Sequence, residues 1–218
     1  MYFPPIGSNS WETTSVASLN WNQNGVQSLL DYLQLKYSKS FIIIVKGRIV
    51  MENYFNNHNA TTTCYWASAG KTLTSTIIGI AEQDGLIDSD ARVSNYIGTG
   101  WTSETVAREN LITCKNLLST KSGIEDIVNG DGVSPLNLQY KADAGTRWAY
   151  HNVYVKLKDV IAPATRQTWS NYFNTKLRDK IGMDGSWLTI DNNSVYFSTT
   201  RSMAQFGLLM LNNGEMGE

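Results

Sequence analysis

The sequence predicts an α+β protein: a partial antiparallel sheet with a flanking helix, joined to a mostly helical region. Two observations predict this class. A helical pattern precedes two β-branched segments separated by a Gly-containing turn, and helical patterns dominate from about residue 68 onward. The composition, with 42% hydrophobic and 11% aromatic residues among 218, can supply a substantial core.

The N-terminal third carries the first helix and the sheet. Val26, Leu29, Leu30 and Leu33 recur at the spacing that gathers apolar side chains on one helix face. Segments 41–45 and 48–55 then read as a hairpin around Lys46-Gly47, because a glycine in the turn can adopt a positive φ.

Helical patterns follow the hairpin. Leu73, Ile77 and Ile80 form a stripe, and Gly85 is well placed to end that helix. Frequent Gly, Asn and Asp between residues 95 and 147 predict long loops with short helices. Further helices are expected over residues 153–161, 169–177 and 203–210.

These elements predict two parts. Residues 1–60 should form the N-terminal part of an α/β domain, and residues 61–218 a mostly helical domain with long loops. Two strands make an inadequate sheet, because an isolated hairpin is at best marginal in water. We therefore expect the remaining strands of the sheet to lie in sequence not present here.

Composition restricts the partners. Lys plus Arg total 18 against 19 Asp plus Glu, which gives a net charge of -1 and no field that would attract nucleic acid. A small-molecule or peptide substrate is expected, whereas the oligomeric state is not predicted. The longest β-branched run, residues 41–45, is too short to span a membrane, and the N-terminal residues lack the features of a signal peptide.

Metal chemistry is not expected. His58 and His151 are the two histidines, and their separation gives no metal-ligand spacing. Cys64 and Cys114 cannot make a disulfide framework, and whether they are bridged is not predictable from sequence.

Ser68-Ala69-Gly70-Lys71 is a Ser-x-x-Lys sequence. If Ser68 opens a helix, Lys71 lies one turn on, where its amine can reach the Ser68 hydroxyl and accept its proton. With 20 Ser and 11 Lys in 218 residues, chance supplies about one such tetrapeptide. Its position carries the signal, because it opens an amphipathic helix directly after a hairpin.

Tyr150-His151-Asn152 is the second candidate element. A phenol beside a lysine ammonium can transfer protons, and an Asn amide can orient both lysine and substrate. The same Tyr-x-Asn spacing begins at Tyr54 and at Tyr172, but Tyr54 ends a predicted strand and Tyr172 lies within a predicted helix. Tyr150 lies on a predicted turn, and turns carry function more often.

A family resemblance connects these elements. Ser68 to Lys71, Leu117 to Gly123, Gly145 to Asn152 and Met203 to Met210 resemble, in this order, landmarks of the class C β-lactamase and D-alanyl-D-alanine carboxypeptidase family. These are serine hydrolases related to β-lactamases and penicillin-binding proteins. The resemblance covers nearly the whole chain, and its specificity comes from order and spacing together.

The resemblance implies a β-lactamase/transpeptidase-like fold in which a helical domain is inserted into an α/β domain. It implies Ser68 as the acylated nucleophile, Lys71 as its activating partner, Tyr150 as general base and acid, and Asn152 as a contact of substrate and lysine. It further implies no metal and no organic cofactor, and it favours a periplasmic or secreted location.

Departures from the family pattern are also present. The family has a Lys-Thr-Gly or His-x-Gly strand near the C-terminus that supplies one oxyanion-hole amide, and no such strand follows Tyr150 in this sequence. Lys121-Ser122-Gly123 precedes Tyr150 and aligns with a loop landmark instead. Loss of one oxyanion donor typically lowers the rate by roughly 100- to 1000-fold, which leaves the activity of this chain open.

Several readings compete. An α/β-hydrolase esterase would need Gly-x-Ser-x-Gly, but Trp66 stands two residues before Ser68 and no His follows His151. A non-catalytic binding module or an inactive fragment on the same scaffold is the second alternative, and an α+β domain in which Ser68 is only a helix cap is the third. Within the enzyme reading the substrate stays open among β-lactams, peptides, esters and linear amides; pocket candidates are loop 126–138 and Trp101, Trp148 and Trp187.

Overall fold

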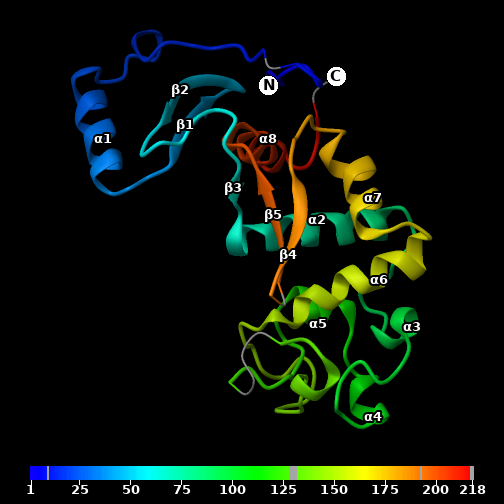
Figure 1. Ribbon diagram of the computed structural model, residues 1–218. Coiled ribbons are helices and arrows are strands. Elements are labelled where there is room, and N and C mark those ends of the chain that lie inside the picture. The colour runs from blue at the N-terminus through cyan, green and yellow to red at the C-terminus, as the bar shows by residue number, and fades with distance from the viewer. Residues whose placement is uncertain (9, 128–131, 192, 217–218) are drawn as a thin grey trace. The chain divides into compact units, whose positions relative to one another are not determined.

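The protein is represented by a computed structural model that describes residues 1–8, 10–127, 132–191 and 193–216 (Figure 1). The chain divides into two compact units. Unit 1 comprises Met1–Trp66, Leu177–Ser186 and Tyr196–Glu218, and unit 2 comprises Ala67–Lys176 and Trp187–Val195. Helices and small antiparallel sheets together confirm the α+β class. The expected division into residues 1–60 and 61–218 stays a prediction.

Unit 1 begins with the predicted helix and hairpin. Helix α1 spans Asn24–Leu35, and strands β1 (Ser40–Val45) and β2 (Arg48–Tyr54) pair antiparallel with a bulge between Ile43 and Ile44. Gly47 occupies the turn at φ 89°, and a Cβ there would lie 1.8 Å from the Tyr2 carbonyl oxygen. The hairpin therefore requires glycine at this position.

The C-terminal helix α8 (Thr200–Leu211) packs on β1 within unit 1. Arg201 donates two hydrogen bonds to the Glu52 carboxylate of β2, both 2.7 Å long. This guanidinium holds the pKa of Glu52 below its ordinary value. Trp66 is buried between Tyr196 and Phe206 and donates to the Ser198 hydroxyl at 2.7 Å, so unit 1 has a core of its own.

Three strands were not predicted from the sequence. They are β3 (Cys64–Tyr65), β4 (Ser186–Ile190) and β5 (Asn193–Ser198), and their order in the sheet is β3-β5-β4. Cys64 and Tyr65 pair antiparallel with Ser198 and Phe197. In Figure 1 β4 and β5 are the two adjacent orange strands.

Unit 2 is built around helix α2, which spans Gly70–Gln83 as predicted. Leu73 and Ile77 of the predicted stripe are at 0% exposure, as are Ile78 and Ala81, whereas Ile80 is only partly buried. Helix α6 (Lys156–Thr165) packs against α2 and also contacts α3 (Ser94–Ile97) and α7 (Trp169–Phe173). Burial of this many apolar side chains supplies the main stabilisation of the unit.

The segment between α2 and α6 is loop-rich, as expected, with short helices. These are α4 (Val106–Glu109), α5 (Cys114–Leu118) and the 3-10 turns Pro135–Asn137 and Asn152–Val155. Glu109 is 1% exposed and accepts hydrogen bonds from the Gly100 and Thr102 amides, both at 2.8 Å. Such a buried carboxylate, satisfied by backbone donors, holds the loop in one conformation. The remaining regular turns are the 3-10 turns Ala17–Leu19 and Ala67–Ala69 and the π-helical turn Asn174–Arg178.

Both cysteines are free thiols, Cys114 buried and Cys64 partly exposed. The open question of a bridge between them is thereby answered. None of the helices in the described part of the chain is long and apolar enough to cross a membrane.

Glu104 gives a testable pH dependence of stability. Burial, opposed by Arg108, raises its pKa to about 7, and its Oε1 atom has no hydrogen-bond partner among the described residues. Because the unfolded chain releases this proton near pH 4.5, native stability should fall between about pH 4.5 and pH 7 and stay lower above pH 7. Glu104→Gln should remove that fall, stabilising the protein by roughly 1–2 kcal/mol at pH 8 relative to its effect at pH 5, as measured by urea unfolding.

Glu82→Gln is the matched control. Hydrogen bonds from the Ser89 side chain and from the Ser89 amide, the latter 2.9 Å long, lower the pKa of Glu82, so its replacement should not stabilise the protein at pH 8. Equal pH dependence of stability in the Glu104→Gln variant and the parent would contradict the assignment.

Candidate active site

Ser68 lies in the 3-10 turn Ala67–Ala69 that leads directly into α2. The preceding residue, Ala67, has φ 47°, a left-handed conformation that a residue with a Cβ seldom adopts. The Ser68 side chain is exposed, whereas Gly70 and Leu73 just beyond it are buried. A hydroxyl is thus presented to solvent from the start of a helix whose next turn is fixed in the core.

Lys71 lies one turn further along on the same face, as predicted. Its Nζ donates to Ser68 Oγ at 3.3 Å. The same Nζ lies 4.8 Å from the ring centroid of Tyr150 and 4.5 Å from that of Tyr154. Among the described residues no carboxylate lies within 4.0 Å of Lys71 Nζ. Its contacts are the Ser68 hydroxyl and the rings of Tyr150 and Tyr154.

Tyr150 joins Ser68 and Lys71 from a distant part of the sequence. Its hydroxyl donates to Ser68 Oγ at 2.6 Å, although the two residues are 82 positions apart. The side chain of Tyr150 is 55% exposed. Three functional groups therefore meet at one accessible oxygen atom, all within unit 2.

Asn152, the fourth predicted site residue, begins the 3-10 turn Asn152–Val155 and is 5% exposed. The turn is capped by His151, whose Nδ1 accepts a hydrogen bond from the Val153 amide at 3.1 Å. This short turn has a further consequence, because it places Tyr154 with its ring beside Lys71. Sequence reasoning missed Tyr154, because an aromatic residue shortly before a helix carries no distinctive signal.

Two backbone hydrogen bonds between neighbouring loops position Tyr150. The Ala149 amide donates to the Thr120 carbonyl at 2.9 Å, and the Gly145 amide to the Lys121 carbonyl at 2.8 Å. Nearby, Arg147 and Asp126 form an ion pair at 2.6 Å, which lowers the pKa of Asp126. Thr120 and Lys121 thus hold the Tyr150 segment through their backbone carbonyls, a role that their side-chain identities do not reveal.

The other two Tyr-x-Asn tyrosines have structural partners elsewhere. The Tyr54 hydroxyl donates to Glu52 at 2.6 Å, and the Tyr172 hydroxyl to Asp84 at 3.1 Å. Tyr172 is fully buried in α7, and burial raises its pKa to about 12. Both phenols are bound to carboxylates rather than to a serine.

The three tryptophans that were candidates for lining a pocket differ in exposure and packing. Trp101 is 6% exposed and Trp148 is 62% exposed, whereas Trp187 packs edge-on against Trp169 and Phe173. Part of loop 126–138, residues 128–131, lies outside the described residues. The described residues contain no group of three or more His, Cys, Asp or Glu side chains that could hold a metal ion.

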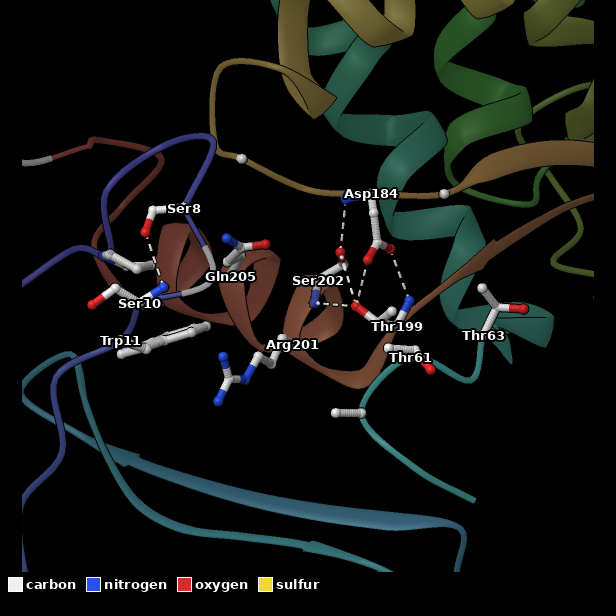
Figure 2. Close-up of a pocket in the computed structure, with 14 residues that line it drawn as sticks. Ser8, Ser10, Trp11, Thr61, Thr63, Asp184, Thr199, Arg201, Ser202 and Gln205 are labelled. Carbon is white, nitrogen blue, oxygen red and sulfur yellow. Dashed lines mark hydrogen bonds between the residues drawn. The ribbon is translucent and has the colours of Figure 1, made fainter. Parts of the chain in front are cut away.

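Unit 1 contains a separate cavity of about 540 Å³ (Figure 2). Its acidic group is internally satisfied, because Asp184 accepts from the Thr199 amide and hydroxyl at 2.8 and 2.7 Å while its own amide donates to Ser202. Arg201, also in its lining, is paired with Glu52. The charges around this cavity therefore stabilise the start of α8, and none of the predicted site residues lines it.

Fold and site together define a β-lactamase/transpeptidase-like α+β protein, in which a serine, a lysine and a tyrosine meet at the start of a buried helix. Residues 37–217 match the family model for Beta-lactamase. The chain therefore belongs to the Beta-lactamase family, and the resemblance drawn from its motifs is confirmed.

Comparison with individual proteins agrees. The chain is 27% identical over 175 residues to "Putative penicillin-binding protein PbpX" of Bacillus subtilis (strain 168), a match that covers 72% of this chain and 43% of PbpX. Among solved structures it resembles the "Putative 6-aminohexanoate-dimer hydrolase from Bacillus anthracis", with a TM-score of 0.76, 19% identity, and coverage of 95% of this chain and 64% of that one.

A third similar structure is the octameric penicillin-binding protein homologue from Pyrococcus abyssi, with a TM-score of 0.70 and 16% identity over 88% of this chain and 57% of that one. At these identities the structural matches show the fold. The chain spans less than half the length of the curated relative, and less than two thirds of either structural neighbour.

Gly123 lies two residues after Lys121, whose carbonyl holds the Tyr150 segment, and its replacement tests how strictly this loop conformation is required. It has φ 82°, and a Cβ there would lie 2.1 Å from the Ala142 carbonyl oxygen, while its own carbonyl accepts from the Lys141 and Ala142 amides at 3.0 Å. Gly123→Ala should destabilise unit 2 by more than about 1 kcal/mol, because it adds both backbone strain and a clash. Thermal unfolding measures this effect.

The matched control is Gly79→Ala in α2. Gly79 has open space around the position of a Cβ, and alanine in a helix interior is favoured over glycine by about 0.5–1 kcal/mol. If Gly79→Ala destabilises the protein as much as Gly123→Ala or more, position 123 does not require glycine and the prediction is wrong.

Proposed function

We propose that this chain carries the nucleophile site of a serine hydrolase that acts through a covalent acyl-enzyme on an amide, ester or β-lactam carbonyl. The observation that carries the proposal is the convergence at Ser68 Oγ, with Tyr150 Oη at 2.6 Å and Lys71 Nζ at 3.3 Å. A nucleophile within hydrogen-bond reach of groups that move protons is the arrangement that acyl transfer needs.

In the proposed first step Ser68 Oγ attacks the substrate carbonyl carbon and gives its proton to the Lys71–Tyr150 pair. Lys71 Nζ lies 4.8 Å from the centroid of the Tyr150 ring, close enough to assist Tyr150 in accepting that proton. The tetrahedral adduct then expels its leaving group, which takes the proton back from Tyr150. Water cleaves the resulting serine ester by the same proton transfers in reverse.

Asn152 is proposed as a contact of the substrate and of Lys71, by resemblance to the family. Its burial at the start of a 3-10 turn supports a fixed orientation, which an amide needs if it is to position another group. Tyr154 adds a second ring beside Lys71 and is proposed as a positioning residue.

The proposed substrate class rests on carbonyl chemistry. Proteins similar to this chain are described as penicillin-binding proteins and as a 6-aminohexanoate-dimer hydrolase. A substrate panel should therefore include a β-lactam, a D-amino acid peptide, a linear amide and a short ester, because the same serine, lysine and tyrosine chemistry serves all of them.

A second candidate function is a non-catalytic binding module or an inactive fragment on the same scaffold. One sequence observation favours it: no Lys-Thr-Gly or His-x-Gly follows Tyr150, so the family's second oxyanion donor is missing from this sequence. Retention of Ser68, Lys71 and Tyr150 at bonding distance favours the enzyme, because a binding protein has no chemical need for all three.

The first test is covalent labelling with a fluorophosphonate, read by peptide mass spectrometry. The parent protein should carry one adduct on Ser68, Ser68→Ala should carry none, and Lys71→Ala should label at least roughly 100-fold more slowly because the Lys71 amine no longer assists the proton transfer from Ser68. Ser75→Ala, which changes an exposed serine of α2, should label at the parent rate. A folded full-length protein that never forms the Ser68 adduct would exclude the enzyme.

Tyr150→Phe and Tyr154→Phe form a second, paired test. Tyr150→Phe keeps the ring beside Lys71 but removes the hydroxyl bonded to Ser68, so the labelling rate should fall by roughly 10²- to 10⁴-fold. Tyr154→Phe keeps its ring beside Lys71 and should change the rate by less than about tenfold. Equal rates in the two variants would argue against proton transfer by Tyr150.

A further inference from the structure

Lys158 of α6 is a partly buried amine that the proposed serine chemistry does not use. Its Nζ lies 5.4 Å from the ring centroids of both Trp169 and Trp187 and donates to the Ser194 hydroxyl. It lines a cavity of about 160 Å³ in unit 2, together with Val155, Thr189 and other residues. The amine therefore has one hydroxyl partner, two aromatic faces and adjacent empty space.

A lysine in such a place would ordinarily be paired with a carboxylate. Among the described residues no Asp or Glu lies within 4.0 Å of Lys158, and the neighbouring Asp159 pairs with Lys156 at 3.5 Å instead. Asp159 contributes a weaker opposing field, so burial prevails and lowers the pKa of Lys158 to about 8.

This environment changes what the amine can do near neutral pH. At pH 7 an amine of pKa about 8 is neutral in roughly a tenth of molecules, against about 0.04% for an ordinary lysine, a difference of about 200-fold. Lower basicity also weakens the nucleophile, by about tenfold if the dependence resembles that of thiolates. At pH 7 Lys158 should therefore react with an electrophile about tenfold or more faster than an exposed lysine does.

We propose that Lys158 is an acylation site, at which the amine accepts a small acyl group from an acyl phosphate. The Nζ lone pair attacks the carbonyl carbon, the bond between that carbon and the phosphate oxygen breaks, and phosphate leaves with the electron pair. The proton released from Nζ passes to phosphate or water, and an amide remains. Acylation removes the charge whose burial is unfavourable, and the adjacent cavity offers room for an acetyl-sized group.

Ser194 and the two indoles have distinct parts in this site. The Ser194 hydroxyl accepts from the ammonium in the structure and can instead donate to a neutral amine or to the carbonyl oxygen of the acyl group. Trp169 and Trp187 enclose Nζ, and although their ring faces attract an ammonium, burial away from water opposes the charge and prevails, because it lowers the pKa of Lys158. The site is separate in chemistry from Ser68 and does not rest on the proposed function.

The test uses the 218-residue protein and acetyl phosphate at pH 7.0, with acetylation of each lysine followed by peptide mass spectrometry. Lys158 should be acetylated at least about tenfold faster than the exposed Lys36 and Lys115. Raising the pH to 10 should reduce that ratio to near or below one, because the exposed amines then also become neutral. A Lys158 rate at pH 7.0 no higher than that of Lys36 or Lys115 overturns the proposal.

Trp187→Leu distinguishes an activated amine from one that is merely accessible. Opening one wall should hydrate Nζ, restore its positive charge and slow acetylation at pH 7.0 by several-fold, whereas a site limited by access alone would react faster. Ser194→Ala is a second variant for use if Trp187→Leu does not fold, as judged by circular dichroism; it leaves both indoles in place and should preserve the pH-dependent ratio. Faster acetylation of folded Trp187→Leu, or loss of the ratio in Ser194→Ala, counts against the proposal.

Discussion

The buried face of α2 is the constraint on which the arrangement around Ser68 depends. Leu73, Ile77 and Ile78 are completely enclosed, so the helix can neither rotate nor slide without exposing large apolar side chains. Lys71 lies in the first turn of this fixed element and Ser68 in the 3-10 turn directly before it, so the core fixes the backbone positions of both residues, and the hydrogen bond between their side chains adds to this. A hydroxyl can stay exposed and still be accurately placed because its position is determined by the core beneath it.

The second half of the site is held by backbone hydrogen bonds rather than by apolar packing. Tyr150 is more than half exposed, so burial contributes little to its position. Hydrogen bonds from Ala149 to Thr120 and from Gly145 to Lys121 fix its loop instead. Such contacts depend on the path of the backbone rather than on side chains, so a change of side chain at Thr120 is expected to disturb the Tyr150 loop less than a change at Gly123, where a Cβ would clash.

Sequence patterns predicted the parts of this structure that follow from periodicity. The helix after Ser68, the hairpin around Gly47 and the pairing of Ser68 with Lys71 all depend on local spacing, and the structure has them. The meeting of Tyr150 with Ser68 across 82 residues could be inferred only from the order of family landmarks, because no local rule brings distant loops together.

Other features were beyond such patterns. Strand β3 has two residues and pairs only with chain more than a hundred residues away, and β4 is largely exposed, so neither shows a clear alternation of buried and exposed side chains. Tyr154 and Lys158 were also missed, because an aromatic and a lysine near the start of a helix are ordinary in sequence. Only the three-dimensional arrangement shows one beside the Lys71 amine and the other between two indoles.

The geometry of attack and the stabilisation of the transition state are separate requirements, and this chain meets them unequally. Ser68, Lys71 and Tyr150 all lie in unit 2, so the proposed nucleophile and its proposed proton partners lie within one compact part of the chain. The family's second oxyanion donor has no counterpart in this sequence, and such a donor is worth roughly 100- to 1000-fold in rate. A fluorophosphonate carries a strongly activated leaving group and therefore needs less stabilisation of the developing oxyanion than an unstrained amide does. The rate of amide hydrolysis relative to the rate of fluorophosphonate labelling therefore indicates how much of the catalytic power these 218 residues supply. It also indicates how much would have to come from an additional oxyanion donor.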